Sequence, residues 1–264
     1  GFTALTANGL VSAGVKGDAQ LLTELIATVF PGMMNSEGAM QGEETETGID
    51  GVTAAYKAPN GAGFAFIANV DGAGLLAVAN TTGSACIYDV NGSDVTGSYA
   101  DFAETVAAYA RDNGDLFTDD DISKLSAYYS KDADYAVLGL DGVYNTVTAA
   151  YTVTENGETL YAFVSRPYGY SNIPMAVYYV LNADGEIVMM NAKEFILEKE
   201  YFSSYTLDAP SYKEGFVGVT CESMTDDVAF ISGATMTTNA VKTATYDVFD
   251  AFATLKENGG LGNE

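Results

Sequence analysis

Apolar residues follow two different periods along the chain. In several segments they recur at intervals of three and four residues, which is the spacing of one face of an α-helix. Turn residues close these segments, as Pro31-Gly32 does for the first and Asn113-Gly114 for the second. The pattern predicts helices over residues 21–30, 99–111, 122–129 and, near the C-terminal end, about 238–256.

Between the predicted helices, apolar and polar residues alternate, which is the period of a β-strand. Asn60-Gly61 and Asn156-Gly157 each separate two such segments, and Asn-Gly is the preferred sequence of a two-residue hairpin turn. Another turn sequence, Asn182-Ala-Asp-Gly185, lies between two further segments. The predicted strands cover residues 52–57, 63–70, 147–151, 160–165, 176–181 and 186–190.

The pentapeptide Val-Thr-Ala-Ala-Tyr occurs twice, at residues 52–56 and 147–151. A short identical string can arise by chance or from shared strand composition. Here, however, several matches follow in the same order at nearly constant spacing, which favours duplication. They pair Gly48-Ile-Asp-Gly51 with Gly139-Leu-Asp-Gly142, and Ala65-Phe66 with Ala162-Phe163.

These patterns together predict an α+β fold made of two related domains. Each domain is expected to hold a small antiparallel sheet, flanked by an N-terminal and a C-terminal helix. The polar, glycine-containing segment 113–118 marks the boundary between them. The predicted domains are therefore residues 1–114 and residues 115–264.

Composition supports a folded protein and excludes several classes of function. Apolar residues make up 48% of the 264 residues, enough for a large core. The 36 acidic and 11 basic residues give a formal charge of -25, which repels nucleic acid and anionic membranes. The chain has no histidine, so Ser-His-Asp and Cys-His catalysis and histidine-ligated zinc or haem are excluded. We expect no catalytic side chain and no metal.

The two cysteines, Cys86 and Cys221, lie far apart and form no C-x-x-C pair, so iron–sulfur ligation is not expected. Whether they are free thiols or one disulfide stays open. A cysteine-poor, tyrosine-rich chain that begins at Gly1 suits the outside of a bacterial cell, after removal of an N-terminal signal or membrane anchor. No segment reaches the roughly 18 apolar residues of a membrane helix. We therefore expect an extracytoplasmic protein.

Hydroxyl side chains cluster directly before the last predicted helix, in Ser232-Gly-Ala-Thr-Met-Thr237. Such side chains can donate to phosphate oxygens, and small residues let a ligand approach the backbone. The first turn of a helix adds unpaired N–H groups and a partial positive charge, which together make a phosphate site. An ordinary N-cap without a ligand is the alternative. The predicted binding residues are Ser232, Gly233, Ala234, Thr235, Thr237 and Thr238.

The same segment, preceded by Asp226-Asp227 and followed by Thr238-Asn-Ala-Val241, resembles the signature Ser/Thr-Gly-Ala-Thr/Ser-x-Thr/Ser of the FMN-binding domain family. That family includes the C subunit of sodium-translocating NADH:quinone reductase and the G subunit of the Rnf electron-transport complex. The resemblance covers about residues 135–255. It implies that Thr237 carries FMN as a phosphoester. It also implies that a separate flavin transferase attaches the cofactor, using FAD and magnesium.

The chain departs from the family pattern in two places. Respiratory members carry a Glu-Thr-Pro-Gly element where this chain has Lys193-Glu-Phe-Ile-Leu-Glu-Lys-Glu200, which argues against membership of a sodium pump or Rnf complex. In the first repeat, Thr96-Gly97-Ser98 aligns with Ser232-Gly-Ala234 and places Asp101 opposite Thr237. A carboxylate cannot form the threonyl ester. One flavin per chain is therefore expected.

The resemblance implies an electron carrier, with a donor and an acceptor that the sequence does not identify. Aromatic candidates for contact with the flavin ring are Tyr168, Tyr170, Tyr178 and Tyr179, although each could equally be a core or surface tyrosine. Two other functions stay open. The chain could be a non-redox binding or cell-surface protein in which the motif only caps a helix, or an FMN enzyme with its own substrate. The latter has less support, since no acid–base group is visible.

Overall fold

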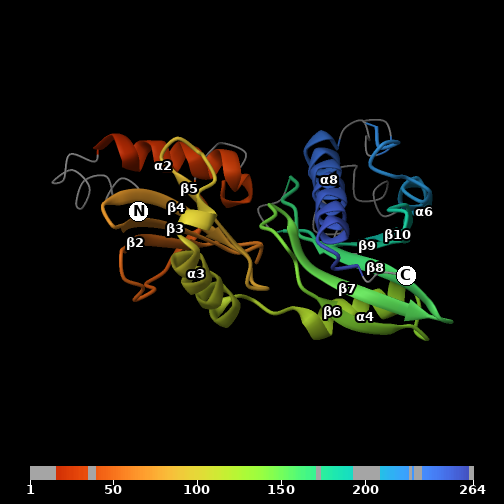
Figure 1. Ribbon diagram of the computed structural model, residues 1–264. Helices are drawn as coiled ribbons and strands as arrows, with labels where there is room; N and C mark the ends of the chain where they lie inside the picture. The colour runs from red at the N-terminus through yellow and green to blue at the C-terminus, as the bar shows by residue number, and fades with distance from the viewer. Residues whose placement is uncertain are drawn as a thin grey trace. The chain divides into compact units, whose positions relative to one another are not determined.

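The computed structural model describes residues 16–34, 40–170, 174–192, 209–225, 228 and 234–261. In this part of the chain the protein is α+β, with two five-stranded antiparallel sheets and several helices (Figure 1). The predicted α+β class and the antiparallel sheets are confirmed. No helix among the described residues is both long and apolar enough to cross a membrane.

The chain divides into two compact units. The first comprises the described residues up to Asp115 together with Gly142–Asn145, and the second comprises Leu116–Asp141 and the described residues from Thr146 onward. Four residues from the second half of the sequence therefore belong to the first unit. The buried side chain of Asn60 donates to the Asn145 carbonyl at 2.9 Å, and Val143 packs against the core of this unit.

The sheet of the first unit is a meander in which each strand pairs with its neighbours in the sequence. Helix α2 packs on one face through Leu22 and Ile26, and α3 packs on the other through Phe102 and Val106 (Figure 1). The elements are α2 (Lys16–Val29), η2 (Pro31–Met33), β1 (Glu43–Glu44), β2 (Val52–Lys57), β3 (Phe64–Val70), β4 (Ala73–Ala79), β5 (Ala85–Asp89), η3 (Thr96–Ser98) and α3 (Ala100–Asn113).

The second unit has a meander of the same kind, in the order β10-β9-β8-β7-β6. Leu125 of α4 packs on one face of this sheet. The ring of Phe252, from α8, lies against Tyr161 and Phe163 of β8. The elements are α4 (Thr118–Tyr128), β6 (Asp134–Leu138), β7 (Val147–Glu155), β8 (Glu158–Ser165), β9 (Val177–Leu181), β10 (Ile187–Asn191), α6 (Pro210–Glu214) and α8 (Thr235–Glu257).

The two sheets share details of register that the repeated pentapeptide accounts for. In β2 the pairing with β3 shifts between Val52 and Ala54, and in β7 the pairing with β8 shifts between Val147 and Ala149. Each shift falls at the threonine of Val-Thr-Ala-Ala-Tyr. A bulge at the same place in both copies bends the two sheets alike.

One difference between the units lies after the third strand of the meander. In the first unit β3 passes to β4 through residues 71 and 72 alone, whereas in the second unit β8 passes to β9 through residues 166–176. The described residues of this longer connection extend the hairpin, because Tyr168 pairs with Pro174 and the Met175 N–H donates to the Pro167 carbonyl at 2.9 Å.

Candidate functional site

The predicted site lies in the first turn of α8, which begins at Thr235 and not near residue 238 as the sequence pattern predicted. Ala234 is the N-cap residue, and its own side chain makes no cap hydrogen bond. Thr235 is exposed, whereas Ala234 is buried. Ser232 and Gly233 lie outside the described residues, as do Asp226-Asp227 and the segment 193–200.

Thr237 occupies the third position of the helix, and its side chain is only 1% exposed. Its hydroxyl oxygen accepts a hydrogen bond from the backbone N–H of Tyr170 at 3.3 Å. Thr238 is equally buried, but its hydroxyl donates to the carbonyl of Ala234 at 3.0 Å, inside the helix itself. Of these two threonines, the structure thus places Thr237 against the extended β8–β9 hairpin.

The same hairpin extension carries a buried polar atom, the hydroxyl oxygen of Tyr168, which bears on whether a phosphate ligand would fit here. The hydroxyl of Tyr168 is buried and has no hydrogen-bond partner among the described residues. Burial raises the pKa of this hydroxyl to about 12, so it is a neutral donor at physiological pH. Tyr168 lies on the hairpin extension whose Tyr170 N–H contacts Thr237. Neutral donors and helix N-termini are the kinds of group that bind a phosphate such as that of FMN.

The four tyrosines singled out from the sequence separate into two groups. Tyr178 and Tyr179 on β9 are fully buried and belong to the core: the Tyr178 hydroxyl contacts Asp121, and the Tyr179 hydroxyl contacts Thr245 of α8 at 3.1 Å. Tyr170, in contrast, is 48% exposed. Tyr168 and Tyr170 therefore remain the candidates for contact with a flavin ring.

The first unit has a different residue at the place of Thr237. Counted from the start of each helix, Thr237 is third in α8 and Phe102 is third in α3, whereas the sequence alignment had set Asp101 opposite Thr237. Burial supports the structural count, because Phe102 is buried and Asp101 is exposed. Counted in this way, Phe102 rather than Asp101 corresponds to Thr237. A phenylalanine, like an aspartate, cannot form a threonyl ester.

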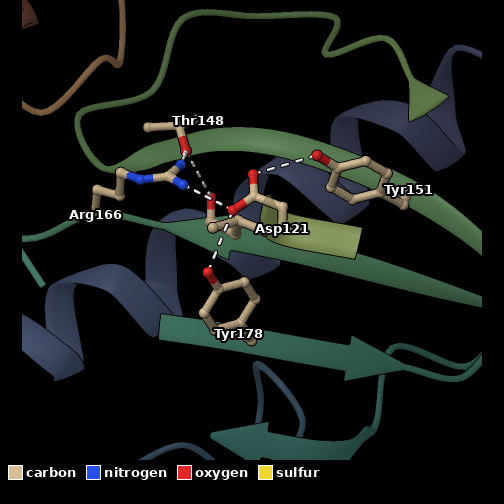
Figure 2. Close-up of polar contacts among 6 residues, drawn as sticks. Asp121, Thr148, Tyr151, Arg166 and Tyr178 are labelled. Carbon is tan, nitrogen blue, oxygen red and sulfur yellow. Dashed lines mark hydrogen bonds and ion pairs between the residues drawn. The ribbon is translucent and has the colours of Figure 1, made fainter. Parts of the chain in front are cut away.

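A buried ion pair lies on the α4 face of the second sheet, and sequence reasoning missed it (Figure 2). Arg166, which follows β8, binds Asp121 of α4 through Nη2 at 2.7 Å, and their side chains are 8% and 0% exposed. The hydroxyls of Tyr151 and Tyr178 donate to the same carboxylate at 3.2 and 3.3 Å. Arg166 also donates to the Thr148 hydroxyl.

Two further features complete the surroundings of Arg166 and Asp121. The Arg166 guanidinium lies 3.8 Å from the centre of the Phe117 ring, a cation–π contact. Burial raises the pKa of the Asp121 carboxyl above its ordinary value, and the neighbouring guanidinium opposes that shift. Phe117 lies in the predicted boundary segment 113–118 and Asp121 directly before the predicted helix 122–129, so no sequence pattern indicated that either residue contacts Arg166.

A half-buried carboxylate joins α8 to the start of β7. Asp247 accepts hydrogen bonds from the Thr146 N–H at 3.0 Å and from the Thr146 hydroxyl at 2.5 Å. The Ser165 hydroxyl donates in turn to the Thr146 oxygen at 2.7 Å. Burial raises the pKa of the Asp247 carboxyl to about 6. This chain of hydroxyls fixes the helix on the sheet.

The cysteines and the acidic residues add no second site. Cys86 and Cys221 are both free, which settles the question that the sequence left open. Among the described residues, no group of three or more histidine, cysteine, aspartate or glutamate side chains could hold a metal ion.

No protein-family model, curated protein or solved structure matches this chain. Any function of the α8 N-terminus must therefore be inferred from the chain's own residues and from the motif.

Proposed function

We propose that this protein is an electron carrier that works outside the cytoplasm, with FMN attached covalently through its phosphate to Thr237. The observation that carries the proposal is the position of the Thr237 hydroxyl. It lies in the first turn of a long helix, within the motif, and contacts the hairpin extension that bears Tyr168 and Tyr170.

Helix electrostatics support a phosphate at this place. The aligned peptide dipoles leave a partial positive charge at the N-terminus of α8, and the first-turn N–H groups point toward a ligand. In a chain with a formal charge of -25, few other features attract an anion. The N-cap residue Ala234 has no side-chain acceptor, so the alternative in which the hydroxyl cluster serves only as a cap has less support.

The attachment needs only one side chain of this protein. Thr237 Oγ1 would form a bond to the phosphorus of the FMN half of FAD, the phosphoanhydride bond would break, and AMP would leave as the hydroxyl proton is released. Tyr170 N–H can keep its hydrogen bond throughout, because it donates to a lone pair of that oxygen. The transferase and its magnesium would supply the charge neutralisation that phosphoryl transfer requires.

When bound, FMN supplies the electron-transfer chemistry, and the protein sets its exposure and surroundings. An electron carrier of this kind needs no general acid or base, which agrees with a chain without histidine. A covalent bond also suits a protein outside the cytoplasm, where a lost cofactor is not easily replaced.

Co-expression of the full chain with a flavin transferase tests the proposal. We expect the intact mass under denaturing conditions to rise by one FMN group, and the denatured protein to keep flavin absorption. Thr237→Ala should abolish the adduct, while Thr237→Ser should retain it because the hydroxyl remains.

Thr243→Ala is the matched control, since it removes an exposed hydroxyl from the same helix outside the motif and should leave the adduct in place. The transferase must label a known acceptor in parallel. If the wild-type chain then gains no flavin, or if Thr237→Ala still carries it, the proposed function is wrong.

A further inference from the structure

Three differences between the two repeats occur together in the second unit. The second unit has Thr237 where the first has Phe102. It has the long β8–β9 connection where the first has a two-residue turn. It also has Arg166 where the first has Asn69, because Arg166 and Asn69 each donate a backbone N–H to the residue just before the repeated pentapeptide.

These differences are linked through the chain. Arg166 is the first residue of the long connection, and Tyr170, four residues later, donates its N–H to Thr237. Between them, Pro167 and Tyr168 pair with Met175 and Pro174 across the extended hairpin. Arg166, at the base of this hairpin, is therefore connected to the Thr237 contact by a short paired segment of chain.

The contacts around Arg166 fix the orientation of its side chain as well as neutralising its charge. The guanidinium binds Asp121 and the Thr148 hydroxyl and stacks on the Phe117 ring. These contacts come from α4, from β7 and from the segment before α4, so they constrain both the plane and the position of the side chain. A buried ion pair adds little stability over apolar residues of the same volume, because desolvation offsets the attraction. Fixed geometry is the property that it supplies here.

We infer that Arg166 and Asp121 are positioning residues for the flavin acceptor: their buried pair holds the base of the β8–β9 hairpin so that Tyr170 N–H stays on the Thr237 hydroxyl oxygen. This inference rests on the proposed function for its biological meaning. The contact that it explains is independent of any flavin.

The test compares amide hydrogen exchange at Tyr170 in the full chain by NMR, with and without the ion pair. In the double variant Asp121→Asn and Arg166→Gln, amide side chains replace the charged groups and keep much of their volume. Arg166→Lys is the milder variant, which keeps the charge but loses the planar fork. We expect exchange at Tyr170 to become faster by up to about tenfold, the change that one lost hydrogen bond produces. Amides in the middle of β8 should change less.

Tyr179→Phe is the matched control, because it removes one buried hydrogen bond on the opposite face of the same sheet. Exchange at Tyr170 should not change in this variant. The rate of flavin attachment at Thr237 should fall in both Arg166 variants and not in the control.

Unchanged exchange at Tyr170 in folded Arg166→Lys, or equal changes at Tyr170 and throughout β8, would overturn the inference. Since exchange is measured without flavin, the inference can fail while Thr237 is still flavinylated. A wild-type chain that gains no flavin would contradict the proposed function, but it would leave the result of the exchange experiment unchanged.

Discussion

The threonines of α8 differ in what their hydroxyls contact. Thr238, Thr245 and Thr254 each donate to the carbonyl four residues earlier, a bond that keeps the side chain against its own helix. The oxygen of Thr237 has a partner outside the helix, because it accepts a hydrogen bond from the Tyr170 N–H. An oxygen whose lone pair faces a neighbouring N–H is oriented by the fold, and such orientation would favour the single ester that we propose for Thr237.

At the same scale, Asp247 makes stability depend on pH. Its pKa is raised by burial from 3.8 to about 6, so between these values the native state binds more protons than the unfolded state. The free energy of unfolding therefore falls as pH rises through this window. In Asp247→Asn the contribution is absent, and the difference in unfolding free energy, variant minus wild type, should rise by about 1 to 2 kcal/mol between pH 4 and pH 7.

Denaturant unfolding of both proteins at several pH values measures this difference. A difference that stays constant with pH would contradict the burial of a raised-pKa carboxyl at this position. The Thr146 hydrogen bonds lower the pKa of Asp247 and are lost together with the carboxylate, so only the change with pH, and not the offset at one pH, reports on Asp247.

Among the elements, the hairpins show what the sequence could and could not predict. Asn156-Gly157 forms the expected two-residue turn, with φ of 54° and 85°. Asn60-Gly61 does not: β2 ends at Lys57 and β3 begins at Phe64, and the Asn60 side chain is buried against Asn145. The local preference was the same in both repeats. A partner 85 residues away decided the conformation of one of them.

In the candidate site, too, local features were predictable from the sequence and contacts between distant residues were not. Its helix is a local feature, so residue spacing predicted α8, although the helix begins at Thr235 and includes Thr237 in its first turn. The Arg166–Asp121 pair joins residues 45 apart, and the β8–β9 connection contains no apolar alternation to mark it as a hairpin extension. The strands β4, β5 and β6 were not predicted either. In β4 the apolar residues run without alternation, because both faces of the sheet are covered.

Turn glycines allow a prediction at this scale. Gly72 and Gly157 both follow a residue of positive φ and have a φ of 85°, and an added Cβ would meet nothing within 4 Å at either. Alanine there should therefore cost only the conformational penalty, about 1 kcal/mol in each case. At Gly63 the added Cβ would lie 2.1 Å from the Ala79 carbonyl oxygen, so Gly63→Ala should cost considerably more. Denaturant unfolding of the three variants measures the ranking, and a Gly63→Ala variant as stable as the other two would contradict it.

At the scale of the whole molecule, the two units have sheets of the same sequential strand order but differ at the start of the last helix. In the first unit Phe102 fills the third position of α3 and packs into the core, whereas in the second the corresponding position holds a hydroxyl. Apolar burial at Phe102 stabilises the first unit by roughly 2 kcal/mol. At Thr237 the second unit has no comparable apolar burial. At this position the side chain of the first unit contributes to stability, whereas on our proposal the side chain of the second unit carries the cofactor.

The first unit also depends on four residues from the second half of the sequence, and Gly32 tests that dependence. An added Cβ at Gly32 would lie 2.4 Å from the carbonyl oxygen of Asn145, so Gly32→Ala must displace residues 142–145 from the first unit. We expect a loss of roughly 1 to 3 kcal/mol, the usual cost of overpacking that shifts backbone. Amides of β2 to β5 should lose protection against hydrogen exchange, while those of β7 to β9 keep it.

Gly97→Ala is the control in the same unit, because an added Cβ there meets nothing within 4 Å. Equal losses in both variants, or a loss spread evenly over the two units, would mean that residues 142–145 do not stabilise the first unit in particular.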